Sequence, residues 1–161
     1  MRIALTLVSA LAATALVATT ALADDGKMYP GTTCVADNDY VDHAWGRAWN
    51  TYTNTNLYEC PVIRDEQDYG IAWGRVWAVD QHPQNGYDVS CSVNSMYSNQ
   101  LNQYAYQSGR TSGSNPAPQA INLGSLSAPQ YGYYYMSCNV PGTYGAVDRS
   151  AVISYYFQEN N

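Results

Sequence analysis

Four cysteines constrain the fold of this chain more than any other feature. Cys34, Cys60, Cys91 and Cys138 all follow an N-terminal segment that has the pattern of an export signal. An even number of cysteines in an exported domain predicts a disulfide framework, and four cysteines allow three connectivities. No pair has the C-x-x-C spacing and the chain has only two histidines, so a zinc site fits these residues less well. We therefore predict two disulfide bonds and no metal site.

Residues 1–23 have the composition of a signal peptide. Arg2 precedes an uncharged run, residues 3–22, which is rich in alanine, leucine, valine and threonine and leads into the small-residue pattern Ala21-Leu22-Ala23. The run is short and weakly apolar for a membrane span, and no second long apolar run follows it. We predict cleavage before Asp24 and a secreted product, extracellular or periplasmic, without a membrane span or lipid anchor in the mature chain.

The mature chain, residues 24–161, has the length of a single domain with one core. Loss of Arg2 with the leader leaves six of the seven basic residues against 13 acidic ones, which gives a formal charge of −7. A negatively charged chain repels nucleic acid, because binding there depends mainly on basic side chains that neutralise the negative phosphates. We therefore expect no nucleic-acid partner, and no motif in the chain indicates a cofactor.

Two segments alternate apolar and polar residues in the way of half-buried strands. Residues 87–94 place Val89, Cys91 and Val93 on one face, and residues 134–140 place Met136, Cys138 and Val140 on one face. Inward cysteines on two strands can meet across or beside a shared core, so we predict a Cys91–Cys138 bond. Cys34 is then left to pair with Cys60. Each bond adds about 3 to 4 kcal/mol to the free energy of unfolding in the loop-entropy treatment.

The chain reads as an all-β domain, a β-sandwich or jelly-roll-like fold of seven or eight short strands. An antiparallel pair is expected between 71–79 and 87–94, because Asn85-Gly86 lies between them and favours a tight reversal. Residues 38–44 could form one helical turn, and residues 99–130 are a polar, loop-rich segment for which we expect mobility. The remaining expected strands are 32–36, 45–52, 57–63, 119–123 and 151–158.

Several short motifs occur in a fixed order along the mature chain. They are Tyr29-Pro30-Gly31 followed by Cys34, then Cys60-Pro61-Val62-Ile63-Arg64-Asp65, and later Cys138-Asn139-Val140-Pro141. This arrangement resembles a group of secreted bacterial proteins with a YPG-x-x-C start and a CPV-x-RD segment, over essentially the whole mature chain. The Trp45–Trp49 segment departs from that pattern. The resemblance implies export and a β-domain, and because the group has no established activity it implies no chemistry.

A short internal repeat is the most distinctive local feature. Ala44-Trp45-Gly46-Arg47-Ala48-Trp49 is echoed by Ala72-Trp73-Gly74-Arg75-Val76-Trp77. On a strand, Trp45, Arg47 and Trp49 would share one face, as would Trp73, Arg75 and Trp77. The structural interpretation is a ladder of arginines stacked on indoles that stiffens a sheet. The functional interpretation is a platform for sugar rings or a partner surface.

All 16 tyrosines lie in the mature chain, with runs at 133–135 and 155–156. Adjacent tyrosines on a strand face opposite sides, so some rings are exposed and available for carbohydrate or protein contact. Tyrosine also has a high β-propensity, and the chain has a single phenylalanine, so we favour the interpretation that tyrosines fill the core.

No catalytic residue can be named from the sequence. The acidic run with Asp37, Asp39 and Asp42 lacks the glycine and glutamate of an EF-hand loop, so a solvated turn is the simpler interpretation. The leading hypothesis is a non-catalytic secreted binding or surface-associated structural domain that contacts glycan or protein through aromatic faces. One alternative is a hydrolase with two converging carboxylates from Glu59, Asp65, Asp80 and Glu159. The other is a subunit of an extracellular assembly joined through strand edges, and the oligomeric state stays open.

Overall fold

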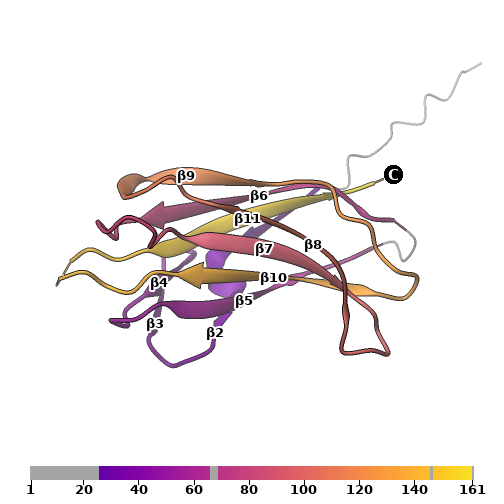
Figure 1. Ribbon diagram of the computed structural model, residues 1–161, viewed down its shortest axis with the longest axis horizontal. Helices are drawn as coiled ribbons and strands as arrows, with labels where there is room; N and C mark the ends of the chain where they lie inside the picture. The colour runs from indigo at the N-terminus through magenta and orange to yellow at the C-terminus, as the bar shows by residue number, and fades with distance from the viewer. Residues whose placement is uncertain (1–25, 66–68, 146, 161) are drawn as a thin grey trace, which may run out of the picture.

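The computed structural model describes residues 26–65, 69–145 and 147–160, and it is a β-sandwich of two layers (Figure 1). Eleven strands and one short 3-10 helix make up the fold. They are β1 (Gly26–Pro30), η1 (Gly31–Thr33), β2 (Val35–Ala36), β3 (Val41–Ala44), β4 (Arg47–Asn50), β5 (Asn56–Val62), β6 (Ile71–Asp80), β7 (Ser90–Met96), β8 (Gln103–Arg110), β9 (Asn115–Leu123), β10 (Tyr133–Val140) and β11 (Ala151–Glu159).

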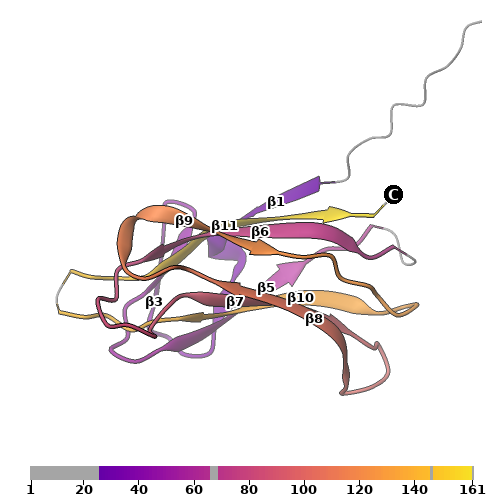
Figure 2. The ribbon, with the colours of Figure 1, turned by 45° about the horizontal axis from the view of Figure 1, so that its top comes forward.

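All strand pairs in both sheets are antiparallel. The six-stranded sheet has the order β3-β4-β11-β6-β9, and β1 also pairs with β11; the five-stranded sheet has the order β2-β5-β10-β7-β8. Figure 2 shows the layers from the side, with β1, β11, β6 and β9 above β5, β10, β7 and β8. The expected sandwich is confirmed, although it has more strands than the seven or eight that the sequence predicts.

Period-two alternation places one face of each sheet in the core. In β5 the buried and exposed residues alternate without a break over Asn56–Val62, and in β10 the buried residues include Tyr134, Met136, Cys138 and Val140. Because side chains on a strand alternate between its two faces, each buried residue turns its neighbours toward solvent. The core is therefore one layer of side chains shared by the two sheets.

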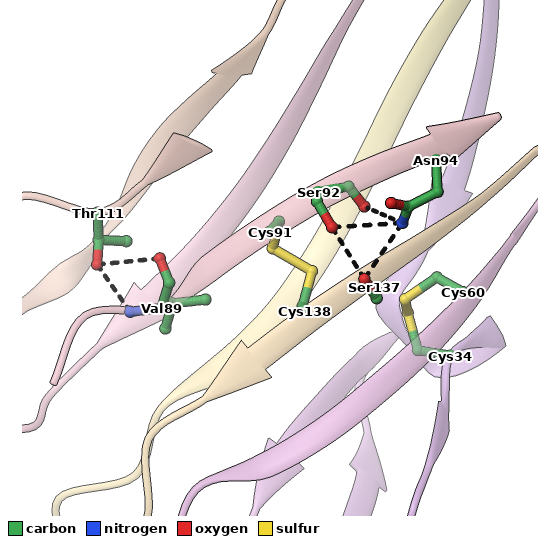
Figure 3. The surroundings of a disulfide bond; sticks show 9 residues. All are labelled: Cys34, Cys60, Val89, Cys91, Ser92, Asn94, Thr111, Ser137 and Cys138. Atoms are coloured by element: carbon green, nitrogen blue, oxygen red, sulfur yellow. Dashed lines mark hydrogen bonds between the residues drawn. A yellow bond between two sulfur atoms is a disulfide. The ribbon is translucent and has the colours of Figure 1, made fainter. Parts of the chain in front are cut away.

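Both predicted disulfide bonds are present, Cys34–Cys60 and Cys91–Cys138. Cys91 and Cys138 are directly opposite each other on the neighbouring strands β7 and β10, so this bond links two strands of one sheet (Figure 3). Cys34 follows η1 and joins the start of the chain to β5. Disulfides of this kind form and persist in oxidising compartments outside the cytosol.

The structure corrects several sequence-based expectations about local structure. Residues 99–130, expected to be loop-rich apart from a strand at 119–123, contain all of β8 and β9. Both are edge strands; β8 buries none of its side chains, whereas β9 buries Ile121 and Leu123. The expected helical turn at 38–44 is instead a turn capped by Asn38, which accepts a hydrogen bond from the Tyr40 amide, followed by β3. The proposed leader, 1–23, lies outside the described residues. No helix in the described ranges is long and apolar enough to cross a membrane.

The expected hairpin between the strands on either side of Asn85-Gly86 is wrong. Gly86 does have a positive φ of 89° in a turn closed by the Tyr87 amide and the Gln84 carbonyl. However, β6 belongs to the six-stranded sheet and β7 to the five-stranded sheet. The turn therefore lies within a loop that crosses from one layer to the other. It does not set a strand register, since β6 and β7 are not paired with each other.

A buried carboxylate fastens this crossing loop. Asp80, at the end of β6, has no exposed surface. Its oxygens accept hydrogen bonds from the His82 amide at 3.1 Å, the Val89 amide at 3.1 Å and the Thr111 hydroxyl at 2.6 Å. The Ser150 hydroxyl donates a further bond at 3.4 Å. One carboxylate thus joins segments next to β6, β7, β8 and β11, which belong to both layers.

We predict that Asp80→Asn lowers the free energy of unfolding by about 3 to 5 kcal/mol, because the new amide group directs its own donors at buried N–H and O–H donors. Urea unfolding followed by circular dichroism measures the change. Glu59→Gln, at an exposed position of β5, is the matched control and should change the stability by less than about 0.5 kcal/mol. A loss for Asp80→Asn no larger than that of the control would contradict the structural role of this carboxylate.

Tyrosines fill much of the space between the sheets. Tyr58, Tyr134 and Tyr155 are 0%, 4% and 0% exposed. Burial raises the pKa of Tyr134 and of Tyr155 to about 12, and it also raises the pKa of Tyr58. Tyr155 of β11 donates to the Pro61 carbonyl of β5 at 2.7 Å and so bridges the layers. The Tyr58 hydroxyl, in contrast, has no hydrogen-bond partner among the described residues.

We predict that buried tyrosines leave the stability unchanged from pH 7 to about pH 10, and that it then falls by as much as about 1.4 kcal/mol per pH unit for each of them. Above pH 10 the unfolded chain loses phenolic protons that the fold still binds, so ionisation favours unfolding. Tyr58→Phe should raise the stability at pH 7 by about 1 kcal/mol, since it removes a buried hydroxyl without a partner, and should make the alkaline slope shallower. Urea midpoints measured from pH 7 to 11.5 test both statements; an unchanged slope in the variant would refute the assignment.

Candidate binding face

The second copy of the repeat lies in the middle of β6 and points outward. Val76 and Ala78 are buried in the core, so Trp73, Arg75 and Trp77 face solvent on the outside of the six-stranded sheet. The Arg75 guanidinium carbon lies 5.6 Å from the centre of the Trp73 ring and 5.8 Å from that of Trp77. This is the predicted arrangement, one arginine between two indoles.

Contacts with neighbouring strands hold these side chains in place. The Arg75 Nε donates to the Asn122 side chain of β9 at 2.9 Å. The Trp73 indole N–H donates to the Gln158 side chain of β11, and its ring lies 4.8 Å from that of Tyr156. Gly74 faces inward, where a β-carbon would lie 2.3 Å from the Phe157 ring. The glycine therefore lets the aromatic core approach the β6 backbone directly beneath the exposed tryptophans.

The first copy of the repeat folds differently, although its amino-acid sequence is nearly the same. Ala44 pairs with Arg47 across β3 and β4, so Trp45 and Gly46 are the two central residues of a hairpin turn. Their φ values are 59° and 78°, as in the type I′ turn that suits the twist of antiparallel strands. The expected strand face with Trp45, Arg47 and Trp49 is therefore wrong for Trp45, which lies at the hairpin tip and is 95% exposed. Arg47 and Trp49 do share a face, with the guanidinium carbon 5.7 Å from the ring centre.

The two copies meet on the outside of the six-stranded sheet. Arg47 of the first and Trp77 of the second line one shallow hollow of about 270 Å³. A larger groove of about 520 Å³ continues from there, and its lining includes Trp45, Arg47, Trp49 and Arg149. We name this surface the tryptophan face; it consists of Trp45, Arg47, Trp49, Trp73, Arg75 and Trp77.

All four tryptophans lie in the described part of the chain, and none of them belongs to its core. Trp45 is 95% and Trp73 is 38% exposed, whereas Trp49 and Trp77 are half-buried. Burying a large aromatic side chain is among the most favourable contributions to folding that a residue can make. A chain that keeps all four indoles outside its core forgoes part of that contribution.

The opposite outer face, on the five-stranded sheet, combines a polar groove with exposed rings such as Tyr106 and Tyr133. The sequence predicts exposed rings in the 133–135 run but does not predict the groove. A groove of about 600 Å³ runs over β7, β8 and β10. Its floor is a hydrogen-bonded cluster in which the Ser92 and Ser137 hydroxyls are 2.9 Å apart and Asn94 donates to both at 3.3 Å (Figure 3). The sequence signal for it is the polar half of the alternation in 87–94 and in 134–140.

The carboxylates named for a hydrolase do not form a catalytic pair in a cleft. Asp80 is buried in its hydrogen-bond cluster. Asp65 and Glu159 are neighbours, but the contact is the Asp65 amide donating to the Glu159 carboxylate at 3.2 Å, and Asp65 pairs with Lys27 at 2.7 Å. Neither lines any of the grooves described here. Glu59 shares a small hollow with Asp37 on the outer edge of β2 and β5.

Neither the acidic run nor the histidines form a metal site. The described residues contain no group of three or more histidine, cysteine or acidic side chains that could hold a metal ion. Asp42 instead lies 3.9 Å from Arg149. His82 stacks on Tyr87 with ring centres 4.5 Å apart, and its Nδ1 accepts from the Gln84 amide at 3.4 Å.

No family model and no curated protein matches the chain. Among solved structures it is similar to the low-affinity xylan-binding module CBM86 of Roseburia intestinalis, at 12% identity and a TM-score of 0.48, covering 84% of this chain and 96% of that one. It is also similar to TmCBM61 in complex with beta-1,4-galactotriose, at 8% identity and 0.40, covering 83% and 88%. Eiger TNF from S. frugiperda matches at 9% and 0.38, covering 86% and 93%. At these scores the likenesses concern the sandwich alone and do not indicate what this chain binds.

We predict that Trp45→Asn raises the free energy of unfolding by about 1 kcal/mol, because asparagine tolerates the left-handed conformation that tryptophan adopts here under strain. Trp45→Val, which removes the same indole but is β-branched, should lower it by about 1 kcal/mol. Urea unfolding followed by circular dichroism compares the two. Equal stabilities for both variants would mean that the turn conformation does not matter.

Proposed function

We propose that this protein is a non-catalytic carbohydrate-binding domain that contacts its ligand through the tryptophan face. The observation that carries the proposal is the placement of all four tryptophans outside the core, in two groups that meet on one sheet. Sugar rings present apolar C–H faces and polar edges, and indoles with adjacent hydrogen-bonding groups complement both. The support is this surface itself and not the likeness to solved sandwiches.

Rigidity of the surface supports the proposal as well. Trp73, Arg75 and Trp77 stand on the central strand β6, and hydrogen bonds to Asn122 and Gln158 orient two of them. A surface whose side chains are already ordered loses less conformational entropy when a ligand binds. Trp45 adds an exposed ring at the hairpin tip, in a strained conformation that asparagine or glycine would adopt more easily.

We also propose that the protein works outside the cytosol after export. Two disulfide bonds support an oxidising compartment. The basic start, the uncharged run and the Ala21-Leu22-Ala23 pattern support removal of a leader before Asp24. The exported domain would then meet polysaccharide at the cell surface or in the medium.

Intrinsic fluorescence offers a direct test, since every tryptophan lies on the proposed face. We expect that a polysaccharide from a panel of soluble neutral and acidic polymers shifts the emission and reduces quenching by acrylamide. A Trp49→Ala/Trp77→Ala double variant should lose tenfold or more in affinity, in the range that aromatic anchors commonly contribute. The matched control is Tyr106→Ala/Tyr133→Ala, which removes two exposed rings from the other sheet and should bind as the unmodified protein does.

Affinity electrophoresis in polymer-containing gels measures the same losses without fluorescence. Circular dichroism establishes that both double variants fold. If every polymer leaves the emission and mobility unchanged, or if the tyrosine variant loses binding while the tryptophan variant keeps it, the proposal is wrong.

A further inference from the structure

The basic residues of this acidic protein are unevenly distributed. Six follow residue 23, and all six lie in the described part of the chain. Three of them, Arg47, Arg75 and Arg149, are on the tryptophan face or line its groove. Asp42 is the single acidic residue in the lining of that groove. The face therefore carries a local positive charge on a chain whose overall charge is negative.

The other three cations are held by protein groups elsewhere. Lys27 pairs with Asp65 at 2.7 Å, and Arg110 pairs with Asp88 at 3.8 Å. Arg64 donates to the Gly132 and Tyr69 carbonyls, both at 3.0 Å, and lies over the Tyr134 ring. Lys27 and Arg64 therefore contribute to the fold, and Arg110, whose side chain is 73% exposed, lies on the other sheet.

Arg47 and Arg75 have different surroundings. Their guanidinium groups lie against indole rings, and no carboxylate of the described residues is within ion-pair distance of either one. Arg75 donates from its Nε to the Asn122 side chain at 2.9 Å, so only one of its five N–H groups is needed for that bond. Arg149 pairs with Asp42 at 3.9 Å, so its charge is partly offset by that carboxylate.

A guanidinium beside an indole is well suited to recognise a carboxylate on a sugar. It is planar and weakly hydrated, and it presents parallel donors that match both oxygens of a carboxylate. A ring stacked on the indole would bring a substituent at its edge to the neighbouring arginine. Charges beyond about 8 Å are screened at physiological ionic strength, so the local arginines act on a ligand more strongly than the distant acidic residues do.

We infer that the tryptophan face takes an acidic polysaccharide built of uronic-acid residues, with arginines beside the indoles pairing with the sugar carboxylates. This inference rests on the proposed function and names the ligand class for that same face. A uronate polymer carries one charge per sugar, which suits single arginines spaced by indoles. A densely sulfated polyanion carries more charges per sugar than the few arginines of this face can pair with.

The test compares polygalacturonate with the same polymer after its carboxyl groups have been reduced to neutral hydroxymethyl groups. Isothermal titration calorimetry and tryptophan emission measure affinity, and dextran sulfate serves as a densely charged polyanion. We expect polygalacturonate to bind at least tenfold more tightly than its reduced form and than dextran sulfate. Arg47→Gln/Arg75→Gln should remove most of that preference, and Arg110→Gln, on the other sheet, should leave it intact.

The outcomes separate this inference from the proposed function. Equal binding of the native and reduced polymers, unaffected by Arg47→Gln/Arg75→Gln, would overturn the acidic class and leave carbohydrate binding in place. Equal or tighter binding of dextran sulfate would overturn carboxylate recognition in favour of general attraction of polyanions. No response to any polymer of either panel would overturn both statements together.

Discussion

The antiparallel pairing of β6 with β11 is the constraint on which the rest of the molecule depends. β11 pairs with β6 along one edge and with β1 and β4 along the other, so it ties together almost the whole six-stranded sheet. Gly74 accommodates the Phe157 ring, and Val76 and Tyr155 are fully buried. Once these side chains point inward, Trp73, Arg75 and Trp77 must point outward, because the alternation of a strand leaves no other choice. The core thus sets the position of the candidate binding surface.

The two layers are joined by polar groups as much as by apolar contact. Asp80 gathers donors from segments next to four strands of both sheets, and Tyr155 reaches from one sheet to a carbonyl of the other. Buried polar groups stabilise a fold only when their hydrogen bonds are made, and they then specify one arrangement of the chain. This sandwich contains few large aliphatic side chains, so tyrosines that are apolar over most of their surface and polar at the tip fill the space and hold the layers in register.

Nearly identical hexapeptides have opposite local structures in this protein. In the first copy, Trp45 and Gly46 form the hairpin tip between β3 and β4. In the second copy, the same two residue types lie in a continuous stretch of β6. The difference lies in the neighbours: β6 is buried between β11 and β9 and must stay extended, whereas the first copy lies at the edge of the sheet, where the chain reverses. Yet β11, lying between β4 and β6, brings both copies to one face. The two copies of this sequence repeat therefore form one surface, although their local structures differ.

The sequence by itself determined the all-β class and most strand positions, because period-two alternation is a local signal. It left three disulfide connectivities open, and the structure confirms the predicted one. It also placed Trp73, Arg75 and Trp77 on one side of a strand. Only the tertiary structure decided that 99–130 contains edge strands, that β6 and β7 lie in different sheets, and that Trp45 occupies a turn. Strand partners, layer assignment and the burial of Asp80 arise from contacts between residues far apart along the chain, and neither composition nor spacing encodes which contacts form.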